Sequence, residues 1–169
     1  MKDITEDFIA ERYDVFRMFN ERWGLVTAGT PEDFNTMTIG WGSLGTIWGP
    51  PMKGKAIVTV YLRESRYTTE YMKKNDLFTV SFFPEEFRRD LGYLGSHSGR
   101  DGNKVAATRL TPERLGGSVG FKQAELTFVC KKLSAMLITD IPDDVRASIY
   151  ADGDLHYAFI GEIISVWQA

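Results

Sequence analysis

The stretch A56-I-V-T-V-Y-L-R-E-S-R-Y-T68 joins a strand-forming run to a helix start through a short polar turn. Residues 56–62 are rich in β-branched and aromatic side chains and contain no Gly or Pro, which predicts a strand. Tyr67, Tyr71 and Met72 give the following segment a partly apolar face, which predicts a helix over about residues 67–75. The stretch therefore predicts a strand, a tight turn and a helix in direct succession.

The turn itself, R-E-S-R-Y-T, carries two guanidinium groups and two hydroxyl groups. We expect Ser65 to be the N-cap of the helix and Thr68 to be its third residue, so that both hydroxyls lie beside unpaired amides. Helix starts attract anions and arginine pairs well with phosphate oxygens, so Arg63, Ser65, Arg66 and Thr68 are candidate phosphate ligands. The alternative is an ordinary cap flanked by solvated arginines; caps are common, so the stretch taken alone favours this alternative.

Strands dominate the rest of the chain. The turn-rich T-P-E-D-F-N separates two strand-like runs and predicts a hairpin. Short helices are expected in residues 4–20, where Val15, Phe16 and Phe19 lie on one side, in the segment that begins at Pro84, and in residues 141–154. Few helices without regular alternation predict a mainly β protein with a predominantly antiparallel barrel. The further expected strands are residues 24–29, 36–41, 77–83, 124–133 and 156–166.

Length and composition predict one domain over residues 1–169, because 43% hydrophobic and 13% aromatic content can form a substantial core. A net charge of -3 argues against a nucleic-acid binder, whose surface would be basic. No apolar run approaches the roughly 20 residues of a membrane span, and the acidic N-terminus does not resemble a signal peptide. We therefore expect a cytoplasmic protein, in which Cys130 is a buried, inert thiol.

Residues 40–45, G-W-G-S-L-G, match the dinucleotide fingerprint G-x-G-x-x-G letter for letter. That fingerprint needs a helix to begin within it, and Gly49, Pro50 and Pro51 prevent a helix of useful length here. We reject the dinucleotide interpretation. Residues 42–55 are instead expected to form a long loop, whose glycines let it pass close to a flat ligand or a partner chain.

A second polar cluster, S98-G-R-D-G-N-K104, combines two glycines with cationic side chains. Gly99 and Gly102 permit the positive φ angles of an anion nest, and Arg100 and Lys104 supply charge; the alternative is a flexible polar turn.

The strand N35-T-M-T-I-G-W41 carries amide and hydroxyl groups that suit the polar edge of a flavin ring, or that simply face solvent. Metal binding is not indicated, because His97, His156 and Cys130 share no ligand spacing. Nucleophilic catalysis is not indicated either, because Ser96, His97 and Ser98 are only neighbours in a loop, which does not orient a hydroxyl toward a base.

Four segments follow one another along the chain: N-T-M-T-I-G-W-G-S-L-G-T-I-W-G, R-E-S-R-Y-T-T-E-Y, L-G-Y-L-G-S-H-S-G-R-D-G-N-K and A-D-G-D-L-H-Y-A-F-I-G-E-I. Together they resemble the flavin reductase-like, FMN-binding split-barrel family that includes flavoredoxins. The resemblance covers nearly the whole chain. It implies a split β-barrel with short helices, acting as a homodimer with FMN near the subunit interface; FAD is the less favoured cofactor, because only one phosphate site is evident.

Carried over by position, the resemblance assigns three groups of residues. Arg63, Ser65, Arg66 and Thr68 would hold the phosphate; Ser98, Gly99 and Lys104 would close over phosphate and ribityl; and Asn35, Met37 and Thr38 would face the isoalloxazine. His156 matches a histidine near the nicotinamide position of such reductases; the alternative is a partly buried histidine bonded to backbone.

Two departures stand out. Asn103 replaces the aspartate that many relatives have before the lysine, and Leu94 stands where relatives often have cysteine. The function implied is NAD(P)H-dependent hydride and electron transfer through FMN to a small-molecule or protein redox partner. The alternatives are an electron carrier reduced by a protein donor, without a nicotinamide site, and a flavin-binding domain without turnover.

Overall fold

The computed structural model describes the whole chain, residues 1–169, and shows a mainly β protein. Every strand pairing is antiparallel. The strands are β1 (Lys2–Asp3), β2 (Gly24–Thr30), β3 (Asp33–Ile39), β4 (Gly42–Ile47), β5 (Lys55–Arg63), β6 (Leu77–Phe82), β7 (Pro112–Leu115), β8 (Ser118–Phe121), β9 (Leu126–Leu137) and β10 (His156–Gln168).

The helices are short and lie around the sheet. Helical segments of six residues or fewer have the label η, and η2 is π-helical. The helices are α1 (Tyr67–Lys74), α2 (Arg88–Ser96), α3 (Asp143–Ile149), η1 (Phe8–Ala10), η2 (Arg17–Arg22), η3 (Glu85–Phe87), η4 (Gly99–Asp101) and η5 (Lys104–Ala107). None of them is long and apolar enough to cross a membrane.

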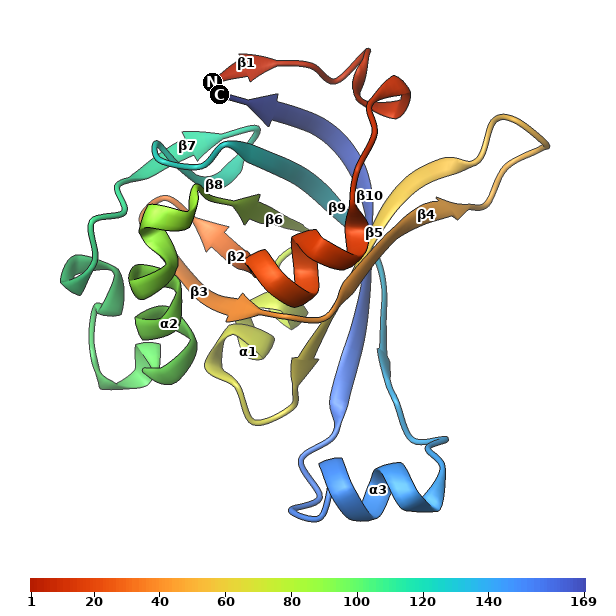
Figure 1. Cartoon of the computed structure of the whole chain (residues 1–169), viewed down its shortest axis with the longest axis vertical. Helices are drawn as coiled ribbons and strands as arrows, with labels where there is room; N and C mark the ends of the chain where they lie inside the picture. The colour runs from red at the N-terminus through yellow and green to blue at the C-terminus, as the bar shows by residue number, and fades with distance from the viewer.

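The main sheet has the strand order β3-β2-β6-β9-β10-β5-β4, with β1 paired to β10. It curls around the core, so that β3 at one edge comes back toward β5 (Figure 1). The predicted antiparallel, mainly β architecture is confirmed. The two-stranded sheet β7–β8 was not expected from the sequence; its turn is made by Gly116 and Gly117, which both have positive φ.

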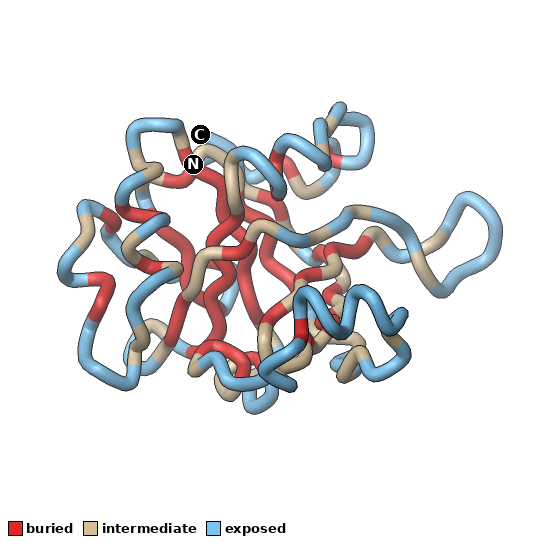
Figure 2. The backbone as a smooth tube through the Cα atoms, turned by 60° about the horizontal axis from the view of Figure 1, so that its bottom comes forward, coloured by how far each residue is buried: buried red, intermediate tan, exposed pale blue.

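The core lies inside the curled sheet, where Figure 2 shows the buried backbone gathered at the centre. Val58, Val60 and Leu62 alternate along β5 and are fully buried against Phe78 and Phe159. This period of two is the geometry of a β-strand, which the β-branched and aromatic content of the segment predicted. Cys130 is buried among the same residues, as predicted, and burial raises the pKa of its thiol.

The N-terminal helical segment covers one end of the barrel, as expected, with Phe19 buried. Phe16, however, is 90% exposed, so the prediction that it shares a face with Phe19 is wrong. Residues 17–22 turn as a π-helix rather than an α-helix. The wider turn changes which side chains share a face, and it brings Met18 instead into the core with Phe19.

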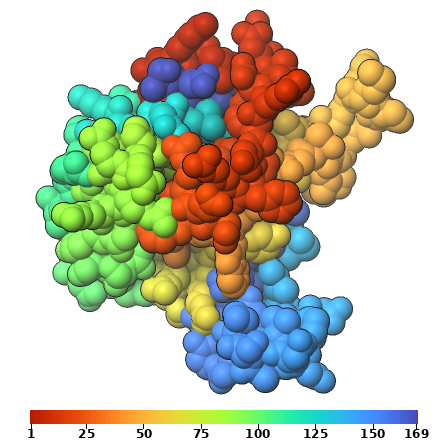
Figure 3. Space-filling model, in the orientation of Figure 1, coloured from red at the N-terminus to blue at the C-terminus, as the bar shows by residue number.

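The prediction of a long loop over residues 42–55 is also wrong. Residues 42–47 form β4, which pairs with β5 along its whole length, and only the Gly- and Pro-rich residues 48–54 form the connecting loop. Figures 1 and 3 show this hairpin, here called the arm, projecting from the body of the molecule. Gly42 allows a close approach within this chain rather than to a ligand or a partner chain, because a Cβ on Gly42 would lie 2.3 Å from the Phe19 ring.

Candidate functional site

Three segments that are distant in sequence meet beside the start of α1: strand β3, the turn between β5 and α1, and the loop that follows α2. Together they line a hollow of about 140 Å³, here called the cup. Eight of the ten residues predicted to bind the cofactor line the cup; they are Asn35, Met37, Ser65, Arg66, Thr68, Ser98, Gly99 and Lys104. The geometry thus brings together the three motifs that the sequence presented separately.

Direct contacts hold these segments in place. Asn35 Nδ2 on β3 donates a 2.8 Å hydrogen bond to Thr68 Oγ1 on α1. The loop after α2 presses against the same amide, because a Cβ on Gly99 would lie 2.1 Å from Asn35 Oδ1. Arg100 Nη1 donates to the Ser65 carbonyl at 3.1 Å, which ties this loop to the β5–α1 turn. Glycine at position 99 therefore allows a close approach rather than a positive φ, whereas Gly102 has the positive φ, 137°, that we predicted.

The charge in the cup comes from two cations that contact no carboxylate. Lys104 is 7% exposed, and its Nζ donates to the carbonyls of Leu94 and His97 at 2.7 and 2.8 Å. Burial, and then the charge of Arg66, lower the pKa of Lys104 to about 8. The Arg66 guanidinium makes no hydrogen bond or ion pair, although those of Arg63 and Arg100 do. Two neighbouring cations that make no ion pair form a site that favours an anion.

The start of α1 adds further free donors. The helix has no side-chain cap, and the amides of Tyr67 and Thr68 have no backbone partner. The Thr68 hydroxyl accepts from Asn35, and its own proton is free to be donated. The prediction that Ser65 is the N-cap is wrong: Arg66 holds that position, and Thr68 is the second helical residue. The uncapped helix start is the kind of donor set that binds phosphate.

Ser65 is instead bonded to Asp154, which lies in the segment between α3 and β10. The Asp154 carboxylate accepts from the Ser65 amide at 2.9 Å and from its hydroxyl at 2.6 Å. No local sequence pattern indicates this contact, because the two residues are 89 positions apart. Asp154 is therefore a residue of the site that our motif analysis missed.

The two remaining predicted ligands lie outside the cup. Arg63 binds the segment after α3: its Nη1 donates to the Asp152 carboxylate at 2.8 Å and its Nη2 to the Ile149 carbonyl at 3.1 Å. Thr38 donates to the Leu91 carbonyl at 2.6 Å and lines a neighbouring hollow of about 260 Å³, which shares Gly95 with the cup. The cup and this hollow lie side by side along β3 and α2.

His156 begins β10, opposite Arg63 on β5. It is buried; its Nδ1 lies 3.0 Å from the Tyr150 hydroxyl, and its ring lies 4.7 Å from that of Trp41. Burial, followed by the charge of Arg63, lowers the pKa of His156, which favours the neutral imidazole near pH 7. The structure thus gives His156 a side-chain hydrogen-bond partner, Tyr150, that the sequence did not suggest.

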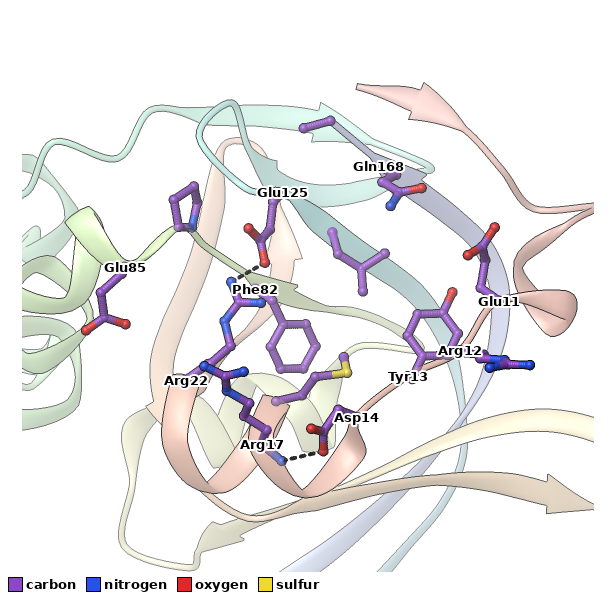
Figure 4. A pocket seen from close by; sticks show the side chains of 14 residues that line it. Glu11, Arg12, Tyr13, Asp14, Arg17, Arg22, Phe82, Glu85, Glu125 and Gln168 are labelled. Carbon is purple, nitrogen blue, oxygen red and sulfur yellow. Dashed lines mark hydrogen bonds and ion pairs between the residues drawn. The ribbon is translucent and has the colours of Figure 1, made fainter.

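A larger hollow, of about 850 Å³, lies elsewhere, between the N-terminal segment and the chain end (Figure 4). Phe82, Met18 and Leu126 line it together with charged side chains, some of which are paired. Arg22 pairs with Glu125 across this hollow, and the Arg17 side chain pairs with Glu21. Arg12 also lines this hollow and makes no ion pair, but no second unpaired cation lies beside it, as one does in the cup.

Comparison with known proteins identifies one matching family and several solved structures with a similar fold. The model of the family described as "Flavin reductase like domain" matches residues 16–169, whereas no curated protein matches the chain. Flavoredoxin from Methanosarcina acetivorans superposes with a TM-score of 0.64 at 22% identity, over 88% of this chain and 68% of that one. An FMN-binding protein from Thermus thermophilus, solved with bound 1-cyclohex-2-enone, gives 0.66 at 21% identity, over 86% and 69%.

A protein from Shewanella frigidimarina with a split barrel domain gives a TM-score of 0.66 at 16% identity, over 100% of this chain and 80% of that one. These likenesses establish the fold, and the predicted split barrel is confirmed.

Proposed function

Because the chain belongs to the flavin reductase-like domain family, we propose that it is a flavoprotein oxidoreductase that binds FMN through the cup. The observation that carries this proposal is the pair of cations that make no ion pair, Arg66 and Lys104, beside the uncapped start of α1. A phosphate monoester supplies the negative charge and the acceptor oxygens that this arrangement lacks. The cup is small and holds one such cation pair, which favours FMN over FAD.

The residues present fit a bound FMN. Arg66, Lys104 and the amides of Tyr67 and Thr68 would hold the phosphate, with Ser98 and Gly99 closing over phosphate and ribityl. Asn35, Met37 and Thr38 would face the ring; the Thr38 proton is already donated to Leu91, so its hydroxyl would act as an acceptor there. When bound, FMN supplies hydride and single-electron transfer, which side chains alone do not provide.

We propose NAD(P)H as the electron donor, with His156 beside the place where the nicotinamide binds. Trp41 and His156 form a partly open aromatic pair, and aromatic faces suit a planar ring. The neutral imidazole that burial favours avoids placing a positive charge beside an oxidised nicotinamide.

Anaerobic mixing of the FMN-loaded protein with NADH and with NADPH tests this proposal. We expect the flavin absorption band in the blue part of the visible spectrum to bleach with at least one of the two nucleotides. A protein that binds FMN but is bleached by neither is not a nicotinamide-dependent reductase. A protein that fails to bind FMN at all contradicts the whole proposal.

The second candidate is an FMN electron carrier, reduced by a protein donor and lacking a nicotinamide site. The exposed arm favours it, because Trp48 is 60% exposed and Met52 is fully exposed at its tip. Such apolar groups suit a protein partner. Bleaching by a reduced redox protein, but by neither nucleotide, supports this candidate over the first.

The proposal also includes the domain organisation, the oligomeric state, the location and the partners of the protein. We propose that residues 1–169 act as one domain, that the protein is a cytoplasmic homodimer, and that its electron acceptor is a small molecule or a redox protein. Neither a membrane nor a nucleic acid is proposed as a partner.

A further inference from the structure

We propose that Asp154 is an internal competitor for the phosphate: its carboxylate holds Ser65 in the ligand-free protein and must release Ser65 when phosphate binds there. Asp154 thereby sets the affinity of the cup for phosphate-bearing flavins. This inference rests on the proposed function, because it concerns the same cup.

The contacts of Ser65 carry the proposal. Both of its donors, the amide and the hydroxyl, point to the two oxygens of one carboxylate, at 2.9 and 2.6 Å. A phosphate group would use the same two donors in the same way, through two of its oxygens. The Asp154 carboxylate thus occupies the donors that a phosphate group would use.

Asp154 and a phosphate cannot both accept hydrogen bonds from Ser65, because Ser65 has too few protons to donate. A serine hydroxyl has one proton and an amide has one, and both are already donated to Asp154. Ser65 therefore cannot donate to a phosphate while these bonds remain. Binding at Ser65 must be an exchange of one anion for another, not the addition of a ligand to free donors.

Asp154 is charged in this position. Burial acts to raise the pKa of its carboxyl, but the hydrogen bonds from Ser65 and the charges of Arg63 and Arg66 together lower it. An ionised carboxylate so close to the cup also repels an incoming phosphate dianion. Asp154 therefore weakens phosphate binding in two ways, by occupying Ser65 and by its charge.

The exchange needs only a side-chain rotation. The backbone around Asp154 is held independently, because Glu64 N donates to the Leu155 carbonyl at 2.8 Å and Arg63 Nη1 donates to the Asp154 carbonyl at 3.3 Å. Arg63 Nη1 also lies 3.8 Å from Asp154 Oδ2. The displaced carboxylate therefore has a cation next to it and can remain ionised after it leaves Ser65.

Titration of FMN and riboflavin into the wild type, Asp154→Asn and Asp152→Asn, followed by flavin fluorescence, tests the proposal. We expect Asp154→Asn to tighten FMN binding by about fivefold or more, since a neutral amide competes less well than a carboxylate. Riboflavin affinity should not change. Asp152→Asn is the matched control, because it removes the same charge from the same segment. Asp152 contacts Arg63 and the Asp154 amide, which an asparagine oxygen can still accept from, and it does not contact Ser65; we expect a change of less than about twofold.

A double-mutant cycle separates competition at Ser65 from a general charge effect. In the Ser65→Ala background, Asp154→Asn should gain less FMN affinity than in the wild type, because the hydroxyl contact is gone while the Ser65 amide and the charge of Asp154 remain. An equal gain in both backgrounds, or an Asp154→Asn variant that binds FMN no better than the wild type, overturns the inference and leaves FMN binding itself established. A wild type that binds no FMN refutes the proposed function instead.

A measurement on the wild type guards against variants that fail to fold. In carbon-detected NMR, the Asp154 carboxyl resonance and the Ser65 amide resonance should both shift on saturation with FMN, and neither should shift with riboflavin. An Asp154 carboxyl resonance that stays in place with FMN bound means that no exchange occurs, which also overturns the inference.

Discussion

At the residue scale, Lys104 makes the site sensitive to pH. Its pKa is lowered to about 8, first by burial and then by Arg66, whereas its usual value is 10.5. A bound phosphate dianion favours the charged ammonium, so FMN binding should take up a proton near pH 8. We expect FMN affinity to fall as pH rises above 8. Calorimetric titration in two buffers of different ionisation enthalpy measures the proton uptake; equal heats in both buffers would contradict it.

The same residue predicts how the ligand-free protein responds to pH. Between pH 8 and 10.5 the unfolded chain holds a proton on Lys104 that the folded chain has released. The free energy of unfolding should therefore rise with pH across this window through the contribution of Lys104. Urea unfolding of the wild type and of Lys104→Met at pH 7.5 and pH 10 isolates that contribution. The rise should be smaller in the variant; an equal rise in both assigns it to other groups.

Arg66 is expected to bind the phosphate directly, because its guanidinium is the unpaired one among the arginines of the β5–α1 turn. Arg66→Ala should weaken FMN binding by about 1 to 3 kcal/mol, as is typical of charge-assisted hydrogen bonds. Riboflavin binding should hardly change. Fluorescence titration of both flavins measures this, and an equal loss for riboflavin would place the phosphate elsewhere.

At the scale of elements, Arg63 belongs to the attachment of α3 rather than to the cup. It joins β5 to the segment after α3 through Asp152 and the Ile149 carbonyl. Arg63→Ala should therefore speed amide hydrogen exchange in residues 143–155 and weaken FMN binding less than Arg66→Ala does. Exchange followed by mass spectrometry tests the first part. Unchanged exchange there, with a loss of FMN affinity as large as that of Arg66→Ala, would return Arg63 to the phosphate site.

The elements also show what sequence can and cannot predict. Strand β5 and helix α1 were predictable, because β-branched and aromatic content and a partly apolar helix face are local properties. Strand β4 was missed, since its glycines suggest a loop and only pairing with β5 stabilises it. The phosphate motifs were found, but not the partner of Ser65: Asp154 lies 89 residues away, and no local pattern reports such a contact.

At the scale of the whole molecule, the arm should mediate the proposed homodimer. It projects from the barrel and exposes Trp48 and Met52, large apolar groups that a lone chain leaves in water. Burying such a side chain contributes about 1.5 to 3 kcal/mol, so two in each chain can matter for association. We expect a solution mass of about twice 19.1 kDa by light scattering.

Trp48→Asp combined with Met52→Lys should shift that mass toward the monomer while leaving the circular dichroism spectrum unchanged, because both side chains lie at the exposed tip of the arm. Phe16→Ser is the matched control: Phe16 is equally apolar and 90% exposed, but it lies on the N-terminal segment. If the control dissociates the dimer and the arm variant does not, the interface lies at the barrel end. If the wild type is a monomer, the arm is free to bind another protein, which is the arrangement that the electron-carrier alternative requires.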